Sequence, residues 1–326
     1  MKAVIATAAG GPEVLEYTDV PDPVAGGGQV VVKVDAAGVN FIDTYRRAGV
    51  YKVGYPHIVG VEGSGRVVSV GPDVADVNEG DAVAWAEGPG SYAEYVAVDA
   101  KNLLPVPEGL DMRTAAALPL QGMTAHYLCR STYPASASTV ALVHAAAGGV
   151  GGLLTQLITS HGGRVIATAG TPEKAERAKS YGASDALVYT ELDDLAAELP
   201  RRVRVLAGGG VDVVFDGVGK TTFDASLASL RPRGMMVLFG GSSGQVPPFD
   251  LQRLNAAGSL FITRPTLAHY TLTRQETLWR AGEVFGAAAS GELKVPIGAS
   301  FPLAEAAQAH RALESRQTTG KVLLVV

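Results

Sequence analysis

The chain has 326 residues, 47% of them hydrophobic, so it can bury a large core, and its length predicts two domains. Its net charge of −5, with no basic run longer than Arg201-Arg202, excludes a nucleic-acid-binding surface and favours small neutral or anionic ligands. The single cysteine, Cys129, excludes an intramolecular disulfide and a multi-cysteine zinc site, and we expect it to pack in a helix. The chain starts without the features of a signal peptide, which together with the lone cysteine predicts a cytoplasmic protein.

The first hundred residues predict an antiparallel β domain. Segments rich in β-branched residues lie at 29–34, 65–70 and 81–85, and glycine-rich turns separate them. After Asp111 the composition changes, and alanine and leucine predict a helix over 115–127.

From residue 139 onward, strands and helices alternate. Apolar runs predict strands at 139–144, 165–169, 186–189, 211–215, 235–239 and 260–263. Helices predicted at 149–161 and 172–181 follow the first two strands, and this alternation predicts a parallel sheet with helices on both faces. Beyond Pro265 we expect helices at 274–290 and 303–315 and a final strand at 321–326.

One uncharged stretch has the length of a membrane span. Residues 139–160 contain no Asp, Glu, Lys or Arg, and about 20 apolar residues can cross a bilayer. Four glycines between 148 and 152 interrupt this stretch, however, and its two halves have the patterns of a buried strand and a buried helix. We therefore expect no membrane segment.

A glycine turn stands where the alternating region begins. The strand at 139–144 runs into Ala146-x-Gly148-x-x-Gly151, and a helix follows at once. Gly148 lets the backbone approach a pyrophosphate, Gly151 lets the helix pack closely on the strand, and the helix N-terminus offers N–H groups to the phosphate charge. Alanine replaces the first glycine of the usual pattern, but the flanking strand and helix predict a dinucleotide-binding turn.

The end of the second strand of this region favours NADPH over NADH. NAD sites carry Asp or Glu about 20 residues after the glycines, whereas this strand ends Ala169-Gly170-Thr171. Lys174 follows one helical turn later, where its ammonium could meet a 2′-phosphate or be solvated; Glu173 beside it could pair with it or repel a phosphate. Tyr189 stands at the end of the next predicted strand, level with the end of the strand at 165–169. The missing acid predicts NADPH.

The segment 217–221 is similar to the end of a P-loop, because Lys220 and Thr221 match the lysine and the hydroxyl residue of that motif. The full pattern needs another glycine at position 214, where Val214 stands inside the strand. We expect an ordinary strand-to-helix turn that faces the cofactor.

The segment 240–244 matches the G-x-S-x-G of serine hydrolases, and His269 and His310 follow downstream. A nucleophile elbow needs a helix directly after the serine, and Pro247-Pro248 bars one. A flexible loop over a cofactor is the better interpretation.

Five segments together resemble the zinc-free quinone oxidoreductases of the medium-chain dehydrogenase/reductase superfamily, the group that includes zeta-crystallin. These segments are 10–15 (GGPEVL), 40–45 (NFIDTY), 145–151 (AAAGGVG), 242–244 (SSG) and Thr263-Arg264-Pro265. The resemblance covers the whole chain. It implies an α/β protein with a GroES-like β-rich domain over 1–122 and 265–326, a Rossmann domain with a doubly wound parallel sheet over 123–264, and a cleft at their junction for the nicotinamide.

The resemblance also implies the absence of zinc. Zinc-dependent members bind the metal through a cysteine, a histidine and a further cysteine, and at the first two matching positions this chain has Asn40 and Val61. Glu62 remains, but a lone carboxylate cannot replace the ligand set of a zinc site. Alcohol oxidation is disfavoured without a Lewis acid, whereas a quinone accepts hydride readily because the product anion is aromatic.

By resemblance, the predicted catalytic residues are Asn40, Asp43, Tyr45 and Tyr51. The two tyrosines would contact a quinone oxygen with Asn40 orienting them, or they would pack with satisfied hydroxyls. Arg316 would be a second phosphate partner, and Gly241 departs from relatives that frequently have asparagine. The residues expected around NADPH are Phe41, Tyr127, Gly148, Gly149, Val150, Gly151, Gly170, Thr171, Lys174, Tyr189, Val218, Phe239, Gly240, Gly241, Ser242, Ser243, Gly244, Arg264 and Arg316.

The predicted function is reduction of a small-molecule quinone by NADPH through metal-free hydride transfer. Enone or enoyl reduction is the nearest alternative, and a non-catalytic NADPH-binding structural or sensor protein is the second. If the strand at 260–263 is last in its sheet, its edge could pair across a twofold axis, so we expect a homodimer.

Overall fold

The computed structural model describes residues 1–315 and 318–326 and divides into two compact units. Unit 1 comprises Met1–Met123 and Thr271–Val326, and unit 2 comprises Thr124–Tyr270. Each unit has its own sheets and its own hydrophobic core.

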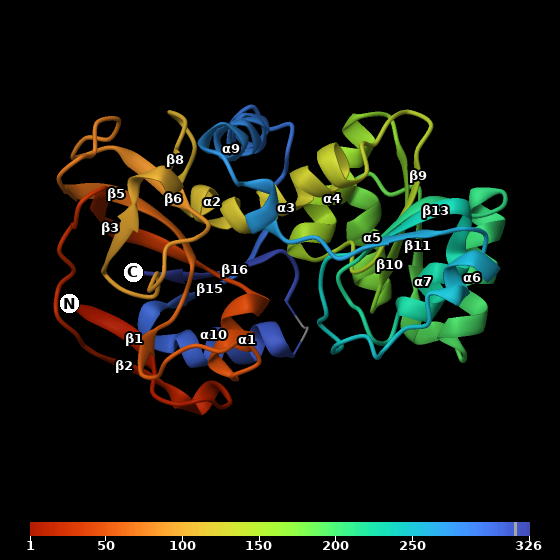
Figure 1. Ribbon diagram of the computed structural model, residues 1–326, viewed down its shortest axis with the longest axis horizontal. Coiled ribbons are helices and arrows are strands. Elements are labelled where there is room, and N and C mark those ends of the chain that lie inside the picture. The colour runs from red at the N-terminus through yellow and green to blue at the C-terminus, as the bar shows by residue number, and fades with distance from the viewer. Residues whose placement is uncertain (316–317) are drawn as a thin grey trace. The chain divides into compact units, whose positions relative to one another are not determined.

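Unit 1 is built on a seven-stranded sheet of order β15-β16-β3-β5-β6-β8, with β7 paired to β3 (Figure 1). Its strands are β3 (Gln29–Val39), β5 (Glu62–Val70), β6 (Ala82–Trp85), β7 (Tyr95–Asp99), β8 (Leu104–Pro105), β15 (Ile297–Pro302) and β16 (Lys321–Val325). A smaller antiparallel sheet has the order β2-β1-β4, with strands β1 (Lys2–Ala6), β2 (Leu15–Asp19) and β4 (His57–Ile58). Except for the parallel pair β15 and β16, the larger sheet is antiparallel.

The long strand β3 organises unit 1. In its first half, Val32 and Val34 are buried while Lys33 and Asp35 are exposed. This alternation is typical of a strand with one buried and one solvent-exposed face. From Ala36 to Val39 every residue is buried, because β16 joins the edge and the alanine face of α2 covers the strand. The strand therefore delivers its C-terminal end, and the residue that follows it, into the interior.

The helices of unit 1 are short except for one. They are α1 (Phe41–Arg47), α2 (Met112–Ala117), α9 (Arg274–Ala289) and α10 (Ala306–Glu314), and α3 (Pro119–Tyr127) continues into unit 2. The core beside α10 includes Val4, Val39, Leu313 and Leu324. Its strands and helices come from both ends of the chain.

Unit 2 has a six-stranded parallel sheet of order β11-β10-β9-β12-β13-β14. Its strands are β9 (Val140–Val143), β10 (Arg164–Ala169), β11 (Asp185–Val188), β12 (Val211–Asp216), β13 (Leu230–Leu238) and β14 (Phe261–Thr263). Its helices are α4 (Gly149–Ser160), α5 (Pro172–Ser180), α6 (Leu195–Ala207), α7 (Phe223–Ser229) and α8 (Gln252–Ala256). The order is that of the doubly wound dinucleotide-binding fold, in which ligands bind beyond the carboxyl ends of the strands where the order reverses. Here that point lies between β9 and β12, so the predicted doubly wound sheet is confirmed.

Short helical turns complete both units. They are η1 (Pro12–Val14), η2 (Ala100–Asn102), η3 (Leu128–Thr132, a π-helical turn), η4 (Tyr189–Glu191), η5 (Leu267–Tyr270) and η6 (Leu303–Glu305). Cys129 is buried in η3.

Several elements differ from the sequence-based expectation, and three of these differences have a clear physical reason. The helix expected over 115–127 is two helices, because Pro119 has no N–H to donate and starts α3 afresh. Strand β13 begins at Leu230 rather than 235, across an irregular register with β12. Strand β15 was not expected; its outward positions are exposed, so it lacks the apolar run that marks the other strands.

The uncharged stretch 139–160 forms β9 and α4, as expected. Within the described ranges, no helix combines the length and apolar character needed to cross a membrane.

Candidate functional site

The glycine turn lies at the carboxyl end of β9, directly before α4. Gly148 caps the helix in an extended conformation, and its N–H donates to the Ala145 carbonyl at 2.8 Å. A Cβ at Gly151 would collide with that same carbonyl oxygen and lie 2.9 Å from the Ala146 Cα. Since both obstacles are backbone, only glycine fits at 151, and α4 can start close to the strand. The first N–H groups of such a helix start can bind an anion such as phosphate.

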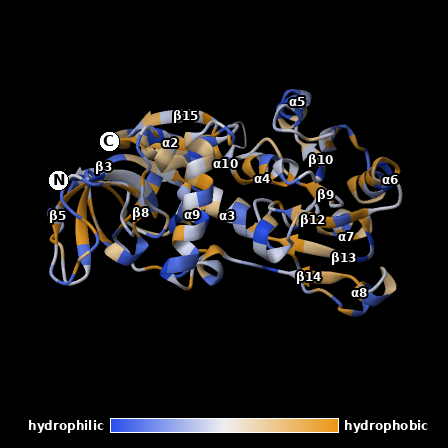
Figure 2. Ribbon diagram, turned by 90° about the horizontal axis from the view of Figure 1, so that it is seen from above, coloured by the Kyte–Doolittle hydropathy of each residue, from blue (hydrophilic) through white to orange (hydrophobic). Residues whose placement is uncertain are grey.

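The loop after β10 brings four of the predicted nucleotide residues together. Thr171 caps α5 by accepting the Lys174 N–H at 3.2 Å, and a Cβ at Gly170 would come 2.8 Å from the Tyr189 hydroxyl. Figure 2 shows α5 mostly in hydrophilic colours, and Lys174 is half-buried in its first turn. Glu173 lies 3.7 Å from Arg177, so it has a partner other than Lys174.

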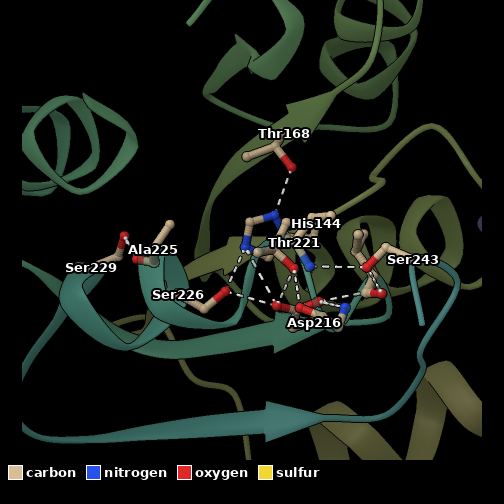
Figure 3. Close-up of polar contacts among 11 residues, drawn as sticks. His144, Thr168, Asp216, Thr221, Ala225, Ser226, Ser229 and Ser243 are labelled. Carbon is tan, nitrogen blue, oxygen red and sulfur yellow. Dashed lines mark hydrogen bonds and ion pairs between the residues drawn. The ribbon is translucent and has the colours of Figure 1, made fainter. Parts of the chain in front are cut away.

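The next two loops of unit 2 are held by a buried carboxylate, Asp216, at the end of β12 (Figure 3). One carboxylate oxygen accepts the N–H groups of Val218 at 2.7 Å and Gly219 at 2.9 Å. The other accepts the hydroxyls of Thr222 at 2.7 Å and Ser226 at 2.8 Å. Four donors converge on one charge, which fixes the turn that carries Val218.

The loop 240–244 is attached to this turn through Ser243. The Ser243 hydroxyl donates to the Val218 carbonyl at 2.7 Å and accepts the Thr221 N–H at 3.0 Å. Gly219 has φ +88°, and a Cβ on it would lie 3.0 Å from the Gly244 carbonyl oxygen. The two loops thus form one unit, and the next helix, α8, begins only at Gln252. This arrangement matches neither a P-loop nor a nucleophile elbow.

His144 extends the network to the first two strands of the sheet. Its ring nitrogens lie 2.9 Å from the Thr168 and Ser226 hydroxyls (Figure 3). Burial lowers the pKa of His144, so the ring is neutral and bridges the two hydroxyls. Sequence reasoning missed His144 and Asp216; the available signal was a polar residue at the carboxyl end of a buried parallel strand, directly before a turn.

In unit 1, Asn40 belongs to a buried polar cluster with Glu62 and Lys321. Its Nδ2 donates to Glu62 Oε2 at 2.7 Å, and its Oδ1 accepts from Lys321 Nζ at 2.7 Å. Lys321 also donates to Glu62, and the Leu120 N–H donates to the other Glu62 oxygen at 2.7 Å. All three side chains are buried. Sequence reasoning missed Lys321, which lies 281 residues from Asn40.

This donor set does not fit a catalytic zinc ion. Asn40 is occupied by hydrogen bonds, Val61 is buried and apolar, and the Glu62 oxygens already accept from three donors, one of them a cation. Zinc needs about four N, S or O ligands with free lone pairs in a tetrahedral array. Across residues 1–315 and 318–326, no group of three His, Cys, Asp or Glu side chains is suited to hold a metal ion.

Asp43 begins a second buried chain, which runs from α1 to α10. The Asn40 N–H donates to Asp43 Oδ2 at 2.9 Å, and the Tyr92 hydroxyl donates to the same oxygen at 3.1 Å. The Tyr92 oxygen lies 3.2 Å from His310 Nε2, and Arg47 donates to His310 Nδ1 at 2.9 Å. Because Arg47 can only donate, Nδ1 is the acceptor and Nε2 carries the ring proton. Asp43 Oδ1 is buried without a hydrogen-bond partner among the described atoms.

The aromatic residues of α1 and the following loop form a cluster. The rings of Phe41 and Tyr45 are 6.1 Å apart, and those of Tyr45 and Tyr51 are 6.2 Å apart. Tyr51 is 48% exposed. The structure brings these three side chains together, while the Asn40 amide is directed to Gly38, Glu62 and Lys321.

Two further predicted nucleotide residues, Tyr127 and Arg264, have contacts outside these loops. Tyr127 is buried, with its ring stacked on Tyr270 at 4.3 Å. Arg264 is exposed after β14, and its side chain donates to the Pro265 carbonyl at 3.4 Å. Arg316 lies outside the described residues.

Comparisons with known proteins cover the whole chain. Residues 26–108 match the alcohol dehydrogenase GroES-like domain, and residues 181–324 match the zinc-binding dehydrogenase family. The chain is 42% identical to a quinone oxidoreductase of Pseudomonas aeruginosa, with 99% of each chain covered, and 40% identical to a 2-haloacrylate reductase of a Burkholderia species, with 97% and 96% covered. The solved structure of mycobacterial Rv1454c complexed with NADPH is 48% identical, covers 100% of both chains and gives a TM-score of 0.97.

The chain of hydrogen bonds at Asp43 predicts an unusual pH dependence of stability. Burial, as the main cause, raises the pKa of Asp43 from 3.8 to about 7, so between these values the folded protein keeps a proton that the unfolded chain has lost. Stability from this group therefore falls as pH rises through that window. Burial, and next the charge of Arg47, lowers the pKa of His310 from 6.5 to about 3, which has the opposite effect below pH 6.5.

Asp43→Asn removes the first effect while keeping an oxygen for Asn40 and Tyr92. Relative to the wild type, we expect its free energy of unfolding to gain about 1.4 kcal/mol per pH unit between pH 4 and 6.5. Urea unfolding at several pH values measures this difference. Parallel curves for the two proteins would show that Asp43 titrates normally.

Proposed function

The chain belongs to the quinone oxidoreductase family of the medium-chain dehydrogenase/reductase superfamily, and we propose that it reduces quinones with NADPH by hydride transfer without a metal ion. The observation that carries this function is the doubly wound sheet whose glycine turn and β10 loop offer a phosphate site with no acid at the strand tip. Its relatives support the substrate and the cofactor: one is named a quinone oxidoreductase, and another was solved with NADPH.

We assign NADPH binding to a domain of residues 123–264, and substrate binding to a domain of residues 1–122 and 265–326. In the first, the α4 N-terminus receives the pyrophosphate and Lys174 the 2′-phosphate, beside Gly170, Thr171 and Tyr189. The turn with Val218 and the loop 239–244 would lie along the cofactor. Hydrogen bonds of Asp216 and Ser243 fix the conformation of both. Arg264 and Arg316 are further phosphate partners. A network that is rigid before binding lowers the entropy lost on binding.

In the substrate half, the chain has to hold a flat acceptor and deliver a proton. Bound NADPH supplies the hydride; the acceptor oxygen takes up a proton, so that quinone, NADPH and a proton become hydroquinone and NADP⁺. Phe41, Tyr45 and Tyr51 form the aromatic cluster that would receive a quinone ring, and the hydroxyls of Tyr45 and Tyr51 would contact its oxygen. Asn40 and Asp43 hold the start of α1, on which Phe41 and Tyr45 stand.

An activated alkene is the second candidate acceptor. The 2-haloacrylate reductase among the relatives acts, by its name, on an alkene next to a carboxylate. The same hydride source and the same aromatic cluster would serve both acceptors, because each carries its electrophilic carbon in conjugation with an oxygen.

We also propose a cytoplasmic homodimer. Strand β14 lies at the end of the parallel sheet, and its residues Phe261 and Ile262 are 57% and 37% exposed. An apolar edge strand of this kind can pair with its copy across a twofold axis. The cytoplasmic location is supported by the cysteine content, because a chain with a single cysteine cannot form an intramolecular disulfide, which fits a reducing compartment.

Purified protein should oxidise NADPH only when an acceptor is present. We expect rapid loss of the NADPH absorbance with small ortho- and para-quinones, and slower loss with 2-haloacrylates and simple enones. Faster turnover of the alkenes would reverse the order of the two candidates. Tight NADPH binding without turnover of either class would mean that the protein is a non-catalytic NADPH-binding protein.

Lys174→Ala tests the assignment of the 2′-phosphate. Loss of the ammonium should raise KM for NADPH by about tenfold and leave KM for NADH nearly unchanged, because only NADPH carries the extra phosphate. Lys179→Ala on the exposed side of the same helix is the matched control. Equal effects of Lys174→Ala on both nucleotides would remove Lys174 from the phosphate site.

A further inference from the structure

We propose that Lys321 is a positioning residue of the substrate site, acting through Asn40 and Glu62. The inference rests on the proposed function, because it concerns the reduction of the quinone. It starts from the buried cluster, in which an ammonium, a carboxylate and an amide are hydrogen-bonded to one another in a ring.

The ring allows only one orientation of the Asn40 amide. An ammonium can only donate, so the atom of Asn40 that faces Lys321 must be the oxygen. An ionised carboxylate can only accept, so the atom that faces Glu62 must be the NH₂ group, whose other hydrogen is directed to the Gly38 carbonyl at 3.3 Å. Without Lys321, the Asn40 oxygen would lose its donor, and only the acceptors on Glu62 and Gly38 would hold the amide.

The packing around the ring is equally specific. A Cβ at Gly38 would collide with Glu62 Oε2 and lie 2.8 Å from Lys321 Cε. The far oxygen of Glu62 is held by the Leu120 backbone N–H, at the start of α3. The ring therefore joins β3, β5, β16 and α3 at one buried point.

The orientation of Asn40 is transmitted to the aromatic cluster through backbone bonds. The Asn40 N–H donates to Asp43, and the Asp43 N–H donates to the Asn40 carbonyl at 3.1 Å. These two bonds form the first turn of α1, which carries Phe41 and Tyr45. A shift at Asn40 thus moves the side chains proposed to receive the quinone, whereas the nucleotide residues lie on other elements.

Lys321 has a second, purely structural effect, which the experiment has to separate from the first. Removing it leaves the Glu62 carboxylate buried without its counter-ion, and such a loss destabilises proteins strongly. Replacing both charges by uncharged side chains of similar size is far better tolerated. The double variant Glu62→Gln/Lys321→Met therefore restores charge balance but not the forced orientation of Asn40.

The test compares wild type, Lys321→Met and the double variant, with Lys179→Met, which breaks an exposed ion pair, as control. For each, Tm is measured together with kcat/KM for a quinone and KM for NADPH. Lys321→Met should have a lower Tm and about tenfold lower kcat/KM for the quinone. The double variant should regain most of the Tm but keep kcat/KM at least about fivefold low, with KM for NADPH within about twofold of wild type.

Recovery of both Tm and kcat/KM in the double variant would overturn the proposal, because Lys321 would then act on stability alone. A rise in KM for NADPH as large as the loss in kcat/KM would overturn it as well. If Lys321→Met does not fold, the double variant still decides the question. Failure of the wild type to reduce quinones would instead refute the proposed function.

Discussion

The ion pair of Glu62 and Lys321 is the interaction on which the proposed substrate-binding half depends. A carboxylate taken out of water needs a counter-charge and hydrogen bonds to its remaining lone pairs, and here Lys321, Asn40 and the Leu120 N–H supply them. The partners come from the beginning, the middle and the last strand of the chain. The pair can therefore form only when both ends of the sequence are folded together, which is the arrangement of unit 1.

A buried ion pair of this kind gives little net stability, because desolvation offsets the attraction of the charges. Its effect is on conformation, because the Lys321 ammonium can only donate and an ionised carboxylate can only accept. Unit 2 uses the same physical device at Asp216, where four donors on one buried carboxylate hold the turn that carries Val218. In both units, a buried charge determines the local shape of a loop or of a helix start.

Much of the nucleotide half could be predicted from the sequence, because its signals are local. The glycine turn, the alternating strands and helices and the missing acid after β10 each lie within about 20 residues of one another, and the helix capped by Thr171 begins where proline and a hydroxyl mark it. The parallel sheet with helices on both faces followed from the alternation of strands and helices. Asp216 and His144 were not found, because a single polar residue at a strand end gives no periodic signal.

The substrate half was less predictable, because its contacts join distant residues. Asn40 and Glu62 drew attention only by comparison with zinc ligands, and Lys321, at the start of a short terminal strand, is indistinguishable in sequence from a solvated lysine. The hydrogen bonds from Asp43 through Tyr92 to His310 join α1, the segment before β7 and α10, which are equally distant in sequence. Burial turns these ordinary polar residues into a specific network, and burial is a property of the fold.

The most direct test of hydride transfer without a metal ion compares the metal content of the protein with its activity. The protein is treated with a strong chelator, its bound metals are measured by mass spectrometry, and kcat with NADPH and a quinone is determined on the same samples. If hydride transfer needs no metal ion, preparations with far less than one metal ion per chain keep full kcat, and added Zn²⁺ does not raise it. Activity that falls in proportion to the metal removed and returns with Zn²⁺ would contradict that conclusion.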